Sequence, residues 1–127
     1  MLDFLKDKNP NEYSSLVLAY IGDAVYELYI RNYIVSKGNY RIDEIHKSSI
    51  KYVKASAQCE NFYKIKDILT EEEIAVFKRG RNAKSRPPKN ADVMEYKIAT
   101  GFEALIGYMY INGNEKRIDE IMNIILQ

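Results

Sequence analysis

Two long apolar stretches constrain the fold of this chain more than any other feature. The first, SSLVLAYIGDAVYELYIRNYIVSKG, follows a helix start signal at residues 9–11 and ends at Gly38. The second, VMEYKIATGFEALIGYMYI, begins at Val93 and ends at the turn formed by residues 112–114. In both stretches apolar residues recur at helical spacing, with no strand-like alternation. Proline and asparagine favour the start of a helix and glycine favours its end, so each stretch is predicted to be one long helix.

The remaining segments are also predicted to be helical. Residues 42–69 fit one or two helices, and residues 115–127 fit a short amphipathic helix. Thr70 and Glu73 have the spacing of a capping box, which predicts a helix ending near Lys84, before the break at residues 87–88. The chain is therefore expected to be a single all-α domain, a helical bundle over residues 1–127, without internal repeats or a linker.

The hydrophobic spacing also indicates which side chains face inward. In the first long helix the predicted inward stripe contains Leu16, Ala19, Tyr20, Asp23, Val25 and Leu28. In residues 42–69 the predicted inward residues are Ile45, Ser49, Tyr52, Val53, Ser56 and Phe62. The tyrosines are expected to pack in a core or dimer interface.

Composition excludes some classes of protein. The sequence has one cysteine, Cys59, so it has no internal disulfide, and we expect a small buried side chain in a reducing compartment. The N-terminus lacks the apolar core of a signal peptide, and no apolar run approaches the roughly 20 residues that span a bilayer. We therefore expect a cytoplasmic protein without membrane contact.

One segment concentrates the positive charge. KRGRNAKSRPPK, residues 78–89, contains six basic side chains and no acidic one. The other residues carry a net charge of −5, because the whole chain is +1 and this segment is +6. A solvated loop and a polyanion-binding loop are both consistent with this pattern.

Two acidic residues, Asp23 and Glu103, lie in the two most apolar predicted helices. A buried carboxylate is costly unless it is paired or bound to a cation. A hydrogen bond to a tyrosine or a pairing with lysine would explain either residue alone. Together they indicate one inward-facing site with the hard oxygen ligands that suit Mg²⁺.

These residues carry a resemblance to a known family. IGDAVYE, which contains Asp23, and FEALIGYMYINGN, which contains Glu103, resemble the paired motifs of the ribonuclease III catalytic domain. The resemblance implies an all-helical endonuclease domain that forms a homodimer. It also implies that Asp23 and Glu103 are catalytic, that both bind Mg²⁺, and that the substrate is double-stranded RNA.

The sequence departs from the family pattern at two positions. Ala19 and Thr100 stand where the family usually has metal-binding carboxylates. The chain also ends soon after the second motif, so we expect no double-stranded-RNA-binding domain. With RGRNAK and a proline-containing stretch before ATGFEALIGY, the sequence is similar to the Mini-ribonuclease III subfamily. That similarity implies maturation of large-subunit (23S) ribosomal RNA precursors, with 5′-phosphate and 3′-hydroxyl ends.

Within this interpretation the basic segment is expected to bind RNA phosphates. Its candidate residues are Lys78, Arg79, Arg81, Asn82, Lys84, Arg86 and Lys89. Thr100 could orient a metal-bound water or bond back to its own helix. Glu27 is expected to form a surface or dimer salt bridge, and His46 to be a packed or surface residue.

Some alternatives stay open at this point. A ribosomal protein could be needed to remodel the RNA. The rival hypotheses are a non-catalytic RNA-binding or ribosome-associated module of the same fold, and a structural helical dimer.

Overall fold

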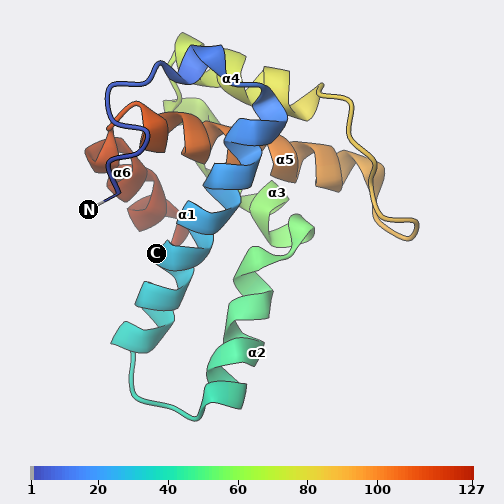
Figure 1. Ribbon diagram of the computed structural model, residues 1–127. Helices are drawn as coiled ribbons and strands as arrows, with labels where there is room; N and C mark the ends of the chain where they lie inside the picture. The colour runs from blue at the N-terminus through green and yellow to red at the C-terminus, as the bar shows by residue number, and fades with distance from the viewer. Residues whose placement is uncertain (1) are drawn as a thin grey trace.

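A computed structural model describes residues 2–127, and its regular elements are helices, as predicted. The α-helices are α1 (Ser15–Ser36), α2 (Ile42–Val53), α3 (Ala55–Ile65), α4 (Glu71–Arg81), α5 (Val93–Ile111) and α6 (Glu115–Ile125). Short 3₁₀ turns, η1 (Pro10–Glu12) and η2 (Lys66–Ile68), precede α1 and α4. Figure 1 shows α4 and α6 near one end of the molecule and α2 at the other.

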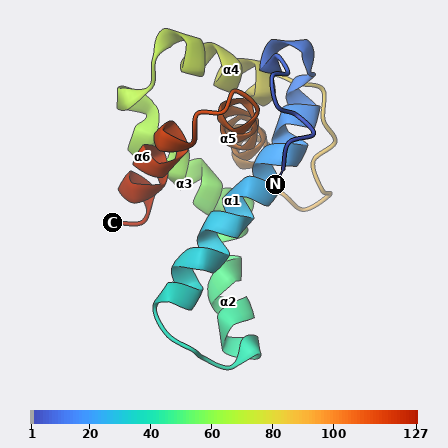
Figure 2. The same ribbon diagram turned by 60° about the vertical axis from the view of Figure 1, so that its left-hand side comes forward.

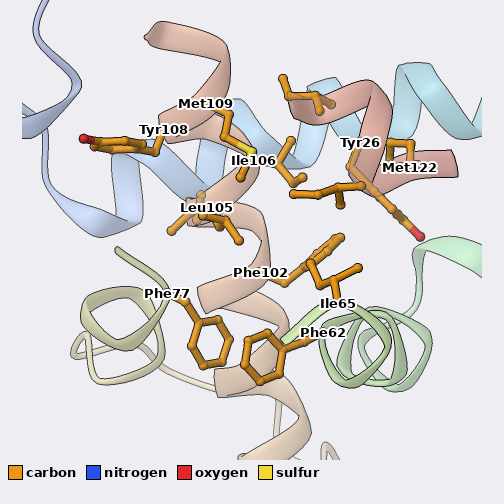
Figure 3. Packing of buried hydrophobic residues seen from close by; sticks show 14 of the residues in the cluster. Tyr26, Phe62, Ile65, Phe77, Phe102, Leu105, Ile106, Tyr108, Met109 and Met122 are labelled. Carbon is orange, nitrogen blue, oxygen red and sulfur yellow. The ribbon is translucent and has the colours of Figure 1, made fainter. Parts of the chain in front are cut away.

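α5 is the central helix of the bundle. It contacts α1, α3, α4 and α6, and Figure 2 shows these helices surrounding it. Figure 3 shows the aromatic part of this core, where the rings of Tyr26 and Phe102 meet edge to face at 5.4 Å and those of Phe62 and Phe77 stack at 3.7 Å. Such ring pairs add specific geometry to the hydrophobic burial that holds the helices together.

The second half of α1 and the whole of α2 project from the body as a two-helix arm (Figure 1). α2 contains no fully buried residue, so its packing is thinner than that of the other helices. The six predicted inward residues of this region are buried or half-buried: Ile45, Ser49, Tyr52, Val53, Ser56 and Phe62. That prediction is confirmed.

The predicted capping box at the start of α4 is present. The hydroxyl of Thr70 accepts from the amide of Glu73, and the Glu73 carboxylate accepts from the amide of Thr70. The same carboxylate accepts two hydrogen bonds from Arg117 of α6, at 2.8 and 2.9 Å. One glutamate therefore both caps α4 and fastens α6 to it.

The boundaries of two helices differ from those predicted. α1 begins at Ser15 with Ser14 as its cap, because Pro10 starts the separate turn η1 rather than the long helix. α4 ends at Arg81, not near Lys84, because Asn82 is its C-cap. Residues 83–92 then form a loop leading to α5.

The predicted inward stripe of α1 is partly wrong. Leu16, Tyr20, Asp23 and Leu28 are exposed, and the buried residues are Leu18, Ala19, Gly22, Tyr26, Ile30 and Ile34. The helix is apolar on most sides, so its spacing alone does not select a face. The face is selected by where α5 can approach it.

Candidate active site

The two carboxylates predicted to form the site are brought together by the crossing of α1 and α5. Gly22 and Gly107 lie at this crossing. A Cβ atom on Gly22 would overlap the carbonyl oxygen of Glu103 and lie 2.8 Å from the amide of Gly107. A Cβ on Gly107 would likewise overlap the carbonyl oxygen of Leu18. The two backbones therefore touch, which only glycine permits at both positions.

This close crossing places Asp23, which follows Gly22, against Glu103. The two carboxyl groups are joined by a side-chain hydrogen bond. Glu103 is half-buried, whereas Asp23 is exposed, so the prediction that both are buried is wrong for Asp23. Asp23 lies on the side of α1 that α5 leaves open, at the rim of the crossing.

The environment of Glu103 strongly favours its protonated form. Burial, together with the hydrogen bond and the charge of Asp23, raises the pKa of Glu103 to about 8. Glu27 adds to this by repulsion, whereas the side-chain amide of Gln58 lowers the pKa of Glu103. Two carboxylates forced together in this way form a site of high negative potential when both are ionised, and a cation would stabilise it.

The positions that depart from the family pattern supply no further carboxylate. Ala19 is buried, and the hydroxyl of Thr100 donates to the carbonyl of Tyr96 at 3.0 Å, which is the second of the two alternatives for this residue. Within residues 2–127 no cluster of three or more acidic, histidine or cysteine side chains could hold a metal ion. The donor set is therefore Asp23 and Glu103.

Three other residues lie where the sequence suggested. Glu27 forms a surface ion pair with Arg31 one turn later in α1, at 3.3 Å. His46 is exposed on α2. Cys59 is half-buried against the core, and burial raises the pKa of its thiol.

The basic segment covers the last turn of α4 and the loop after it. Lys78, Arg79, Asn82, Lys84, Arg86 and Lys89 are exposed, and Arg81 is half-buried. The guanidinium of Arg81 lies 5.8 Å from the centre of the Phe77 ring, and its Nε donates to Asn82. In the described part of the chain, no hydrogen bond or ion pair joins this segment to Asp23 or Glu103.

α4 is itself held close to α5 by a second pair of glycines. A Cβ on Gly80 would lie 2.9 Å from the Cα of Gly101, and one on Gly101 would lie 2.7 Å from the carbonyl of Phe77. The basic turn that follows Gly80 is therefore fixed to the same helix that carries Glu103.

Comparisons with known proteins agree with this architecture. The ribonuclease III domain family matches residues 16–114, which include both glycine crossings and both carboxylates. The chain belongs to the ribonuclease III family. A Mini-ribonuclease 3 from Clostridium tetani is 50% identical over 124 residues, covering 96% of this chain and 79% of the relative. A Mini-ribonuclease 3 from Staphylococcus aureus is 38% identical over 128 residues, covering 98% and 96% of the two chains.

The family assignment also holds at the level of structure. A crystal structure of a protein from Fusobacterium nucleatum superposes with a TM-score of 0.85 and 40% sequence identity, covering 94% of this chain and 98% of that one. The Mini-ribonuclease 3 relatives confirm the resemblance to that subfamily, and the superposition agrees with the predicted all-helical fold.

Sequence reasoning missed the residues that hold the site in place. The role of Gly22 and Gly107 could have been suspected, because small residues within apolar helices often mark a close crossing. Gln58 gave no such signal, since a single glutamine within a helix is usually exposed. In the structure it is buried, with only 2% of its surface accessible, beside Glu103.

Proposed function

We propose that this chain cuts double-stranded RNA with Mg²⁺ bound by Asp23 and Glu103. Membership of the ribonuclease III family makes it an endoribonuclease. The observation that carries the proposed site is the pair of carboxylates, 80 positions apart in sequence, that the Gly22–Gly107 crossing holds together.

The donor set fits Mg²⁺. This ion takes oxygen ligands, and it is commonly bound by one or two carboxylates with water and substrate phosphate completing its shell. Burial and the neighbouring Asp23 raise the pKa of Glu103, and a bound cation would relieve both effects by stabilising the ionised carboxylates. When bound, Mg²⁺ would neutralise charge on the scissile phosphodiester and lower the pKa of an attacking water.

The two carboxylates have different positions and therefore different tasks. Glu103 is anchored in the half-buried interior of the crossing, and Asp23 extends to the surface, where a duplex backbone could reach it. We expect Asp23 to lie next to the bound substrate and Glu103 to bind the metal ion from the interior of the site. In-line hydrolysis there leaves a 5′-phosphate and a 3′-hydroxyl.

RNA binding is assigned to the basic segment, residues 78–89. Its exposed cations can neutralise backbone phosphates, which supply most of the sequence-independent affinity for a duplex. The exposed side chain of Asn82 can bond a sugar or a base edge. The anchoring of Gly80 on Gly101 gives this segment a fixed origin on α5.

The exposed apolar face of α1 supports a homodimer. Tyr20 is 79% exposed and Leu28 is 59% exposed, and Leu16 and Val17 extend the same apolar surface. A second copy of the chain would cover side chains that are costly to leave in water. Two active sites, one in each subunit, could then cut the two strands of a duplex.

The proposed cellular substrate and location rest on the resemblance of the two motifs to the Mini-ribonuclease III subfamily. We propose that the chain matures large-subunit (23S) ribosomal RNA precursors in the cytoplasm. No helix in residues 2–127 is both long and apolar enough to span a membrane. The name of these relatives, Mini-ribonuclease 3, supports the nuclease assignment.

The decisive experiment compares wild type, Asp23→Asn and Asp67→Asn on duplex RNA with and without Mg²⁺. Asp67 is exposed in η2, far along the chain from either motif, so its variant controls for the loss of one surface charge. We expect Asp23→Asn to lose cleavage but to keep RNA binding. We expect Asp67→Asn to keep both activities. Binding without cleavage by wild type would favour the non-catalytic module, and neither activity would favour the structural dimer.

A further inference from the structure

We infer that Gln58 is the positioning residue of the active site, and that its side-chain amide holds the carboxylate of Glu103 in place against Asp23. This inference rests on the proposed function, because it assigns a task within that same site. It concerns a residue of α3 that neither sequence motif contains.

The first observation is the burial of a polar side chain. Gln58 is 2% accessible, and it lies among the largest fully buried side chains of the protein. Burying an amide costs free energy unless its hydrogen bonds are made, and an apolar side chain of similar size would fill the space without that cost. A glutamine buried at this position is therefore expected to form hydrogen bonds with neighbouring polar groups.

The partners lie on two different elements. Nε2 of Gln58 donates to the carbonyl oxygen of Val53 at 3.2 Å. Val53 is the last residue of α2, where carbonyl groups lack partners within the helix. Gln58 also lies beside Glu103, because both line the same pocket, and its amide lowers the pKa of Glu103, which favours the ionised carboxylate. A primary amide has two N–H donors, which is enough for both.

Gln58 approaches Glu103 from a different side than Asp23 does. Gln58 and Glu103 both line a pocket of about 170 Å³, together with Val53, Ala55, Tyr96, Ala99 and Thr100. The hydroxyl of Thr100 is directed back to the carbonyl of Tyr96, so its proton is not offered to Glu103. Gln58 approaches from α3, on a different element from Asp23 of α1, so the Glu103 carboxyl is held by groups from two helices.

A separate hydrogen-bond network lies next to Gln58 and supports the fold of this corner of the bundle rather than the Glu103 carboxyl. Tyr26, one turn after Asp23, donates to the carbonyl of Tyr52 at 2.7 Å and accepts from Asn61 at 2.8 Å. The final carbonyls of α2 are thus bonded by Tyr26 of α1 and by Gln58 of α3. No buried side-chain nitrogen or oxygen in the described residues is left without a partner.

Gln58 thus stands behind a ligand as supporting groups do at metal sites generally. Such groups orient the ligand, and their removal typically lowers metal affinity or activity by about 10- to 100-fold. We expect Gln58→Met, which keeps the length of the side chain and removes the amide, to lower kcat by roughly that factor. The KM for duplex RNA should not change, because Gln58 is buried and does not face the basic segment.

The matched control is Asn61→Leu. Asn61 is a buried amide one turn later in α3, and it bonds Tyr26 rather than Glu103. This variant loses a buried hydrogen bond of the same kind and therefore shares any general loss of stability. It should keep wild-type kcat at a temperature where all the proteins are folded, as judged by circular dichroism.

A second readout avoids catalysis and RNA. Mg²⁺ should raise the melting temperature of the wild-type protein alone, because it binds only the folded state. Gln58→Met should need about 10- to 100-fold more Mg²⁺ for the same rise, whereas Asn61→Leu should respond as wild type does. If Gln58→Met does not fold, Gln58→Asn keeps a buried amide but withdraws it by one methylene, and it should show the same two losses.

The outcomes separate this inference from the proposed function. If Asp23→Asn abolishes cleavage but the foldable Gln58 variant matches Asn61→Leu in kcat and in Mg²⁺ response, the inference is overturned and the proposed site stands. If Asp23→Asn still cleaves, the proposed site itself is wrong. A loss confined to the Gln58 variants, in both readouts, supports the inference.

Discussion

Gly22 of α1 and Gly107 of α5 face each other across a helix crossing in which the two backbones are in contact. Helix axes usually lie 8–10 Å apart, with side chains between them. At this crossing no side chain intervenes, and the residue after Gly22, Asp23, is thereby placed on Glu103. The chemistry of the site thus depends on two residues that contribute no functional group.

The first prediction concerns this crossing. Gly22→Ala should lower the free energy of unfolding by about 3 kcal/mol and abolish cleavage, because the new Cβ would overlap backbone atoms that cannot rotate away. Urea unfolding measures the first effect. Gly113→Asn is the control, since Gly113 has open space around it and a φ of 74°, a conformation that asparagine tolerates. Equal stability of Gly22→Ala and wild type would contradict the crossing.

The second prediction concerns the pH dependence of stability without metal. The pKa of Glu103 in the folded protein, about 8, lies above its ordinary value of 4.5. Its contribution to stability is therefore fully present below pH 4.5 and is lost as the pH rises through about 8. Glu103→Gln should stabilise the metal-free protein by roughly 2 kcal/mol at pH 9 and have little effect at pH 5.

Thermal melts in a chelator at both pH values measure this difference. Glu27→Gln is a suitable comparison, because Glu27 contributes only the smallest of the interactions that raise the pKa of Glu103. A Glu103→Gln variant that is less stable than wild type at pH 9 would show that the carboxylate is not under strain.

The third prediction concerns RNA affinity. Lys84→Glu and Arg86→Glu alter two exposed residues of the basic segment without disturbing the Arg81–Phe77 contact. Each lost phosphate contact should reduce the slope of log binding constant against log salt by about 1. Lys116→Glu, at an exposed position of α6, should leave the slope unchanged. Slopes that match wild type in all three variants would remove the segment from the RNA-binding surface.

The fourth prediction concerns assembly. Tyr20→Glu places a charge in the centre of the exposed apolar face of α1 and should convert a dimer into monomers, as measured by sedimentation equilibrium. Tyr63→Glu changes a comparably exposed tyrosine on α3, at 53% accessibility, and should remain dimeric. A monomeric wild type, or a Tyr20→Glu dimer, would contradict the proposed interface.

Much of this protein follows from local sequence patterns. The spacing of apolar residues identified the helices, and Thr70 with Glu73 identified the start of α4, because capping and helical periodicity are interactions between near neighbours. The pairing of Asp23 with Glu103 also came from the sequence, through the resemblance of two motifs. Their contact in the structure agrees with that pairing.

Other features were decided only by the tertiary structure. The sequence predicted that Asp23, Tyr20 and Leu28 point inward, yet all three are exposed. α1 is apolar around most of its circumference, so no local signal could select its buried face. That choice was made by α5, which can approach α1 only where Gly22 leaves room. The burial of Gln58 beside Glu103 depends in the same way on the meeting of three helices, a long-range arrangement that the spacing of residues within one helix does not record.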